Sequence, residues 1–531
     1  MGTVSIRQAA PLPETSRYNE STEVEAVART LPKHSASVAQ LDRAAGFYPA
    51  GSGFESWRGR SSYPSPVTHV PDNASDDRVG MVRSGSVFAP DRRLLTSGLV
   101  LIVTLVAFES MSVATVMPLV ESDLGDLALY GWVFSAFFLG TLVGVVVAGT
   151  AADRMRPAIP FAVGLVLFAV GLVAGGMAPT MLVLVLGRFL QGVGAGVMPA
   201  TSYVCIGRIY PLAQRPKMFA LISSAWMLPS VIGPVIAAWI AETVGWRWVF
   251  LGLLPLTAVI GGIAIIGVKS VPAPDEPSNE RNILNAVLVA VGAGLLLIGL
   301  GSRSLFVFLP VTVIGAVVMV RPFMRLTPEG TLRARAGLPA TVAVRGLLNF
   351  GFYAADAFVP FAITTVRGMS PIYGGLAMTT ASLTWTVSSW LQTRWIRTRG
   401  ATVLVVVGMT IIGLGTAGMA TVLVPAIPGW VGLIAWAVAG FGMGLAFSPL
   451  AHVAMEVAEK GKEGKATTAL QLSDTLGAAL GIGVAGVLVS TVGTLTNSEV
   501  TGLVLTFGMA TAVALFGAVL GTRVPRGSEL G

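Results

Sequence analysis

The sequence predicts an all-α membrane protein that crosses the bilayer many times. Only 12% of its 531 residues are charged, whereas soluble domains contain about 25%. Hydrophobic residues make up 53% of the chain, and its 63 glycines are spread through apolar runs. Such a composition is typical of helices that pack closely in lipid. It excludes an ordinary soluble globular fold.

Fourteen apolar stretches long enough to cross a bilayer follow one another from Leu94 onward. The first six lie at about 94 to 118, 128 to 150, 158 to 178, 180 to 206, 217 to 242 and 247 to 268. Two thinner stretches follow, at about 283 to 301 and 304 to 320. The last six lie at about 338 to 365, 371 to 393, 401 to 422, 429 to 455, 466 to 492 and 500 to 521. We therefore expect two six-helix bundles with two additional transmembrane helices between them.

The positions of Lys and Arg predict which side of the membrane each connection faces, because cytoplasmic connections hold these residues in excess. With the N-terminus inside, basic residues gather in every second connection, and the opposite side receives only Arg247, Arg303 and Arg367. Both chain ends are therefore expected in the cytoplasm of an inner-membrane protein. The net charge of +8 then follows from topology, and we expect no nucleic-acid partner.

Residues 1–80 do not share this pattern. They contain no apolar run, and the stretch SVAQLDRAAGFYPAGSGFES at 37–56 resembles the translation of a transfer-RNA gene. Residues 54–56 match the T-loop of such a gene, and residues 41–44 match its D-loop. We expect either a disordered cytosolic tail or a non-native extension, with a working protein that begins near Met81.

Two pairs of features with nearly the same spacing indicate an internal repeat. A glycine triplet at 192, 194 and 196 recurs 248 residues later, and Glu109 and Asp356 are 247 residues apart. Nearly equal offsets at unrelated positions predict two homologous halves, residues 81–268 and 338–531. The linker 269–337 then holds the two additional helices, which we expect at the periphery.

Polar residues inside the predicted spans are the candidate functional residues. The span 180–206 contains LGRFLQGVGAG, in which Arg188 lies about 12 Å from the outer end of its helix. An arginine at this depth is costly unless it faces water or an anion. Gln191 follows it, and Gly192, Gly194 and Gly196 permit close helix packing.

Two carboxyl groups are predicted at similar depth, one in each half. Glu109 precedes the outer residue Glu121 by 12 positions, and Asp356 precedes the outer residue Arg367 by 11. A carboxyl group inside the membrane is a natural proton carrier. The structural alternative for Glu109 is a static ion pair with Arg188, because helical rise places the two only about 6 Å apart in depth.

Three further features complete the set of candidates. Asp474, inside the span 466–492, is a candidate cavity residue, and Trp226 is its counterpart in the repeat. The connection GTAADRMRP at 149–157 is a short cytoplasmic turn, and its candidate residues are Gly149, Asp153, Arg154 and Arg156; the resemblance given below implies that it is a cytoplasmic gate loop. Gly233 and Pro234, in the span 217–242, permit a bend and close packing.

These motifs resemble those of the major facilitator superfamily over residues 94–521. GTAADRMRP resembles the signature loop of that family, and LGRFLQGVGAG resembles its helix 4 motif. Glu109, nine residues before Pro118, and the pair Gly233 and Pro234 resemble motifs of the fourteen-helix drug:proton antiporter branch. The sequence departs from these patterns after Arg156, at Glu109, where the family has Asp, and around Gly233, where several glycines are missing.

The resemblance implies a proton-coupled exporter of small amphipathic compounds, in which two bundles rock about a central site. It implies that Glu109 and Asp356 carry the proton and that Arg188 and Gln191 tune them. The expected partners are a small-molecule substrate, protons and the lipid bilayer, and we expect a monomer. Two alternatives remain at this point: a proton symporter or facilitator for a small-molecule nutrient, and a membrane sensor or lipid-handling scaffold that transports nothing.

The sequence predicts neither an enzyme nor a metal site. A single cysteine, Cys205, and three histidines leave little for a zinc site. The stretch GKEGKATT at 461–468 resembles a phosphate-binding loop but lacks the first glycine and the Ser/Thr that such a loop requires. We therefore expect no cofactor, and a transporter driven by the proton gradient.

Overall fold

The computed structural model of this chain describes residues 86–152, 154–211, 214–274, 283–459 and 463–526, and all of them belong to one compact unit within residues 47–531. Over these residues the chain is helical, with no β-strand, which confirms the all-α prediction. The predictions for residues 1–80 lie outside the described residues.

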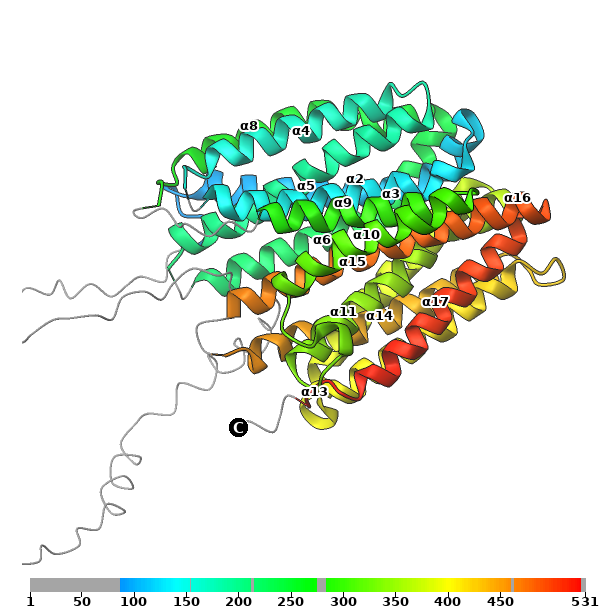
Figure 1. Ribbon diagram of the computed structural model, residues 1–531. Helices are drawn as coiled ribbons and strands as arrows, with labels where there is room; N and C mark the ends of the chain where they lie inside the picture. Colours follow the sequence, from blue (N-terminus) through cyan, green and yellow to red (C-terminus); the bar gives the residue numbers. More distant parts are fainter. Residues whose placement is uncertain (1–85, 153, 212–213, 275–282, 460–462, 527–531) are drawn as a thin grey trace, which may run out of the picture. The chain divides into compact units, whose positions relative to one another are not determined.

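The helices follow the predicted spans closely (Figure 1). The first half contains α2 (Arg93–Leu124), α3 (Leu127–Ala152), α4 (Ala158–Gly176), α5 (Met181–Ile209), α6 (Arg215–Thr243), α7 (Arg247–Leu251) and α8 (Leu253–Lys269). The linker contains α9 (Ile283–Leu300), α10 (Leu305–Leu326) and η2 (Thr331–Arg333). The second half contains α11 (Leu338–Asp356), α12 (Val359–Phe361), η3 (Ala362–Val366), α13 (Pro371–Val422), α14 (Val431–Val457), α15 (Glu463–Val487), η4 (Leu488–Val492), α16 (Gly493–Thr496) and α17 (Glu499–Gly521).

Thirteen helices of the described chain are long and apolar enough to cross a membrane. The longest, α13, has 52 residues, and a straight helix of that length would measure about 78 Å, more than twice the thickness of the hydrocarbon core. It is interrupted at Gly400, whose φ of 75° and ψ of 159° are not helical. Glycine adopts a positive φ at little cost, so this position is suited to a break.

The span 338–366 is also interrupted, directly after Asp356. Four residues later stands Pro360, which has no N–H to donate to the carbonyl of residue 356. The chain continues through the short helix α12 and the π-helical turn η3. Asp356 therefore lies at the C-terminal end of α11, inside a membrane span.

The two glycine triplets pack in the same way. Gly192 and Gly196 of α5 lie against the backbone of α3, and Gly194 between them lies against α4. In the second half, the triplet of α14 packs against the two parts of α13 in the same order, through Gly440, Gly442 and Gly444. Each triplet therefore presents alternate faces of its helix to two neighbouring helices.

The two halves meet along two contacts, here called seams: the first joins α3 to α15, and the second joins α13 to α6. The residues in them are related by nearly the same spacing in the sequence. In the first seam the Ser135 hydroxyl on α3 donates to the carbonyl of Ala479 on α15, at 2.8 Å. In the second the Thr379 hydroxyl on α13 donates to the carbonyl of Val231 on α6, at 2.9 Å. Ser135 and Thr379 are 244 residues apart, and Val231 and Ala479 are 248 apart. Both hydroxyls lie eight residues into their helices, toward the predicted outer end.

Beside each of these hydrogen bonds, a glycine brings two backbones together. A Cβ atom at Gly131 would lie 2.8 Å from the Cα of Gly486, across the first seam. A Cβ atom at Gly375 would lie 2.9 Å from the carbonyl oxygen of Pro234, across the second. Real Cβ atoms essentially never come so close. The two halves therefore touch, backbone against backbone, near the predicted outer end of each seam.

The inserted helices differ in how deeply they pack. α10 is exposed over most of its length and buries only Gly315, Pro322 and Phe323. α9 buries a stripe of small residues in a cluster that includes Leu139 of α3 and Leu476 of α15. The expectation that both helices are peripheral is therefore wrong for α9, which packs against both halves.

Candidate functional site

Glu109 of α2 and Arg188 of α5 form a buried ion pair in the first half. Their side chains are 1% and 2% exposed, and the pair joins Arg188 Nη1 to Glu109 Oε1. The same nitrogen donates to Gln191 Oε1 at 2.8 Å, and Arg188 Nε donates to the carbonyl of Val133 at 3.3 Å. The guanidinium also lies 4.1 Å from the centre of the Phe137 ring. The structure thus brings together Glu109, Arg188 and Gln191, and it pairs the first two as in the alternative of a static ion pair.

This cluster leaves one acceptor and one donor unused. Glu109 Oε2 and Gln191 Nε2 are buried and have no hydrogen-bond partner. The negative charge is nevertheless compensated by a cation with good hydrogen bonds, which is what a buried charge requires. Glu109 can lose its charge only by leaving Arg188 uncompensated.

Asp356 lies apart from this cluster, on α11. It is half-buried, and no ion pair joins it to another residue of the described chain. The indole of Trp436 on α14 influences this carboxyl group, but its Nε1 makes no hydrogen bond of ordinary geometry. Glu109 and Asp356 are therefore both carboxyl groups inside membrane spans, but only Glu109 is paired with a cation of the described chain.

Asp474 of α15 is held by Arg345 of α11. Arg345 Nη2 donates to Asp474 Oδ2 at 3.0 Å, and Arg345 Nε pairs with the other carboxylate oxygen. Asn349 donates to the same Oδ1 at 2.8 Å, and the guanidinium lies 3.2 Å from the centre of the Phe447 ring. The side chain of Asp474 is 23% exposed, against 4% for Arg345. Trp226, its predicted counterpart, is 40% exposed on α6, and no described interaction joins the two.

Sequence analysis missed Arg345, Asn349 and Trp436. Arg345 lies seven residues into the span 338–366, near the end that the charge pattern places inside. The sequence offered little signal for it, because an arginine near the cytoplasmic end of a span resembles an ordinary cytoplasmic one. Trp436 could have been found from the repeat, since it lies 248 residues after Arg188.

The other predicted residues occupy separate places. Gly149, Arg154 and Arg156 of the gate loop are exposed, and Asp153 lies outside the described residues. A Cβ atom at Gly233 would make an ordinary contact with the Phe108 ring at 3.6 Å. The carbonyl of Pro234 forms part of the second seam, as described above. The loop and the bend in α6 are thus not part of either ion-pair cluster.

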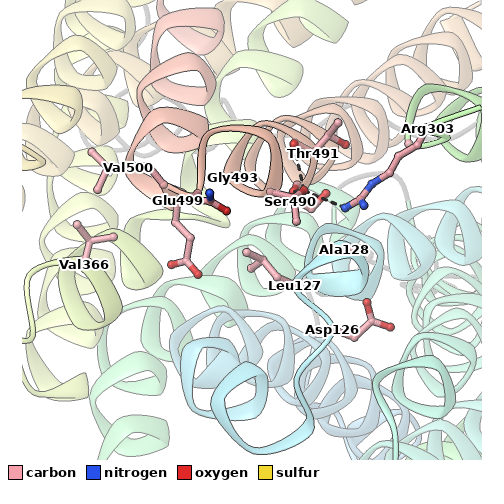
Figure 2. A pocket seen from close by; sticks show the side chains of 14 residues that line it. Asp126, Leu127, Ala128, Arg303, Val366, Ser490, Thr491, Gly493, Glu499 and Val500 are labelled. Carbon is pink, nitrogen blue, oxygen red and sulfur yellow. Dashed lines mark hydrogen bonds between the residues drawn. The ribbon is translucent and has the colours of Figure 1, made fainter.

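A pocket of about 730 Å³ lies at the predicted outer end (Figure 2). It is lined by the turn that begins α3, by the turn between α9 and α10, and by η4 and the start of α17. Its charged residues are Asp126, Arg303 and Glu499. Arg303 Nη2 donates to Thr494 at 3.0 Å, so the linker contacts the second half here.

Comparison with known proteins agrees with this architecture. The Multidrug transporter protein MdtP of Bacillus subtilis (strain 168) is 26% identical over 418 residues, which are 75% of this chain and 75% of that protein. A probable multidrug-efflux transporter of Mycobacterium tuberculosis (strain H37Rv) is 25% identical over 447 residues, which are 80% of this chain and 94% of the relative. The solved structure of the POT family transporter PepTSo has a TM-score of 0.59 at 15% identity, over 80% of this chain and 96% of that chain.

The family model decides the assignment. It describes the Major Facilitator Superfamily and matches residues 99–482, which is most of the chain. The helices of membrane length, the two related halves and the transporter relatives all agree with that match. The chain is therefore a multi-pass membrane protein that belongs to the Major Facilitator Superfamily.

Proposed function

We propose that this protein exports small amphipathic compounds from the cytoplasm in exchange for protons, by alternating access in the inner membrane. The observation that carries the proposal is a set of three carboxyl groups inside the membrane spans, on α2, α11 and α15. Charges inside a membrane are costly, and idle ones are rare, so they mark ion or substrate pathways. Relatives whose names describe multidrug transport support export rather than nutrient uptake.

Alternating access requires contacts that hold one end closed and can be broken. The two seams supply such contacts: a hydroxyl-to-carbonyl hydrogen bond and a close backbone approach on each side. Because the repeat relates the seams, both can open in one symmetric rocking motion. We further propose that α13 crosses the membrane twice, with its turn at Gly400, which gives fourteen crossings and two cytoplasmic ends.

Dye transport into inside-out membrane vesicles tests the proposal. Vesicles from a pump-deficient strain that expresses the protein are energised by respiration and offered ethidium, tetraphenylphosphonium or chloramphenicol. We expect accumulation of at least one probe, its loss when an uncoupler collapses the proton gradient, and acceleration when the gradient is restored. The double variant Glu109→Gln/Asp356→Asn is the control, because its amides keep the shape of the side chains but cannot carry a proton. It is compared at equal amounts of folded protein, since Glu109→Gln leaves Arg188 without its carboxylate.

Three results would count against this function. Accumulation that survives the uncoupler would exclude coupling to protons. Gradient-driven accumulation only in right-side-out vesicles would indicate uptake of a nutrient. No movement of any probe in either orientation, with the protein folded in the membrane, would favour a scaffold.

A further inference from the structure

We propose that Asp356 is the proton-exchanging carboxyl group of this transporter and that Trp436 positions it by donating a hydrogen bond to its charged form. The other two intramembrane carboxylates, Glu109 and Asp474, remain paired with arginines. This assignment rests on the proposed function, because it says which group carries the proton that drives export.

The position of Trp436 is fixed by ring stacking. Its ring lies 4.9 Å from that of Phe352 with an angle of 22° between the planes. Phe352 and Asp356 are four residues apart on α11, so they lie on the same face of the helix, one turn apart. Trp436 therefore packs on the face of α11 that carries Asp356.

The indole of Trp436 has an unused donor. Trp436 is fully buried, and its Nε1–H has no hydrogen-bond partner. A buried donor without an acceptor is costly. The indole influences the carboxyl group of Asp356, and a charged carboxylate there would accept the bond. The unused donor is thus explained if the structure represents the protonated form of Asp356, in which the indole does not donate to the carboxyl group.

The internal repeat supports this pairing independently. Glu109 and Asp356 are 247 residues apart, and their donors Arg188 and Trp436 are 248 apart. Both halves therefore place an acid on the first helix of the half and a donor on the fourth. The difference is that the donor is a cation in the first half and a neutral N–H in the second.

That difference decides which acid can exchange a proton. If Glu109 or Asp474 becomes protonated, the loss of its negative charge leaves Arg188 or Arg345 as an uncompensated cation inside the protein. If Asp356 becomes protonated, no cation is left without a partner, because none in the described chain pairs with it. Proton uptake at Asp356 therefore carries the smaller electrostatic penalty.

Other titratable groups near α11 do not provide a cation for Asp356. Tyr130 of α3 donates its hydroxyl hydrogen to the carbonyl of Ala357, at 3.1 Å. Asp474 of α15 is occupied by Arg345. The remaining titratable residues that the structure describes on α11 and on the helices packed against it are Arg333, Tyr353, Tyr373, Arg394, Arg397, Arg399, His452, Glu456, Lys465 and Glu499. None of them forms an ion pair with Asp356.

The exchange step is simple proton transfer. The O–H bond of the Asp356 carboxylic acid breaks, the proton passes to water, and the electron pair stays on the carboxylate oxygen. The N–H of Trp436 then donates to that oxygen and keeps its own proton. The reverse step returns a proton from water to the carboxylate and frees the indole N–H again.

Infrared difference spectroscopy of the purified protein tests the assignment without any substrate. Spectra of samples at a series of pH values should contain a carboxylic acid band that disappears as the pH rises. We expect this band to be absent in Asp356→Asn and retained in Glu109→Gln and Asp474→Asn. In Trp436→Phe, which keeps the ring on Phe352 but removes the N–H, the band should persist with its midpoint at higher pH, because the charged form has lost a donor.

Trp385→Phe is the matched control, since Trp385 also packs on Phe352, with ring centres 5.8 Å apart. Its pH midpoint should equal that of the wild-type protein. No band in the wild type, a band that survives Asp356→Asn, or one that is lost in Glu109→Gln would overturn the assignment of Asp356. An unchanged midpoint in Trp436→Phe would overturn the role of Trp436. Failure of the vesicle experiment with these spectra intact would instead refute export, so the two proposals fail separately.

Discussion

At the scale of single residues, the membrane part of this protein is governed by how each charge is compensated. Asp474 is bound by Arg345 through both of its oxygens and by Asn349 through one of them. Such a two-pronged arrangement is the strong form of a carboxylate–guanidinium interaction. Because Arg345 is almost completely buried, its removal affects the protein mainly by leaving the aspartate without a cation.

We predict that Arg345→Leu lowers the stability of the folded protein. Loss of one partner from a buried ion pair costs about 3 kcal/mol, at the lower end of the usual range because Asp474 is partly exposed. Thermal unfolding in detergent should show a lower midpoint and a reduced monodisperse yield. The double variant Arg345→Leu/Asp474→Leu should regain most of the loss, and Arg399→Leu, at an exposed position, should behave like the wild type.

At the scale of helices, the seams between the halves are closed by residues that the repeat places in corresponding positions. Gly131 and Gly375 are 244 residues apart, as are Ser135 and Thr379. Each glycine lies one helical turn before its hydroxyl residue, on the same face. The closed contact at the predicted outer end therefore depends on the absence of a side chain at two related positions.

We predict that Gly131→Leu holds the predicted outer end of the first seam apart. Already the Cβ atom would lie 2.8 Å from the backbone of Gly486, so α3 and α15 cannot keep their present distance. Spin labels at Asp126 and Asn497, exposed residues that line the outer pocket, should report a longer distance in the variant. The labels are introduced after replacement of the buried Cys205 by serine.

Gly207→Leu is the control for the labelling experiment, because a Cβ atom at Gly207 would meet nothing within 4 Å. The label distance in this variant should match that of the unmodified protein. An unchanged distance in Gly131→Leu would show that the glycine contact does not keep the outer end closed.

At the scale of the whole molecule, the order of the helices could be predicted, and the ion pairs between them only in part. A membrane span can be recognised from the hydropathy of about twenty consecutive residues, without knowledge of the rest of the fold. The Glu109–Arg188 pair could be given as an alternative, because both residues are isolated charges inside apolar runs at similar depth. Arg345 was not, because an arginine near the start of a span resembles an ordinary cytoplasmic one. Its role depends on α15 lying beside α11, which only the folded chain establishes.

We predict that a reporter inserted beside Arg303 is located outside the cytoplasm. This connection between α9 and α10 distinguishes two spans from a hairpin that never crosses the membrane. Alkaline phosphatase fused there should be active, because it folds only in the oxidising periplasm. A fusion in the connection 327–337 should be inactive. An inactive fusion at Arg303, with an intact membrane protein, would reduce the number of crossings and remove α9 and α10 from the membrane.

The position of α9 has a consequence for the mechanics of the whole transporter. Because α9 contacts α3 in one half and α15 in the other, any motion that separates these helices must slide α9 along at least one of them. The α9 residues in the cluster with α3 and α15 are small: Ala286, Val289, Ala290 and Ala293. Small side chains make shallow ridges, so few contacts along this part of α9 have to be broken when one helix slides past the next. We therefore expect α9 to cover the contact between α3 and α15 while opposing their relative movement only weakly.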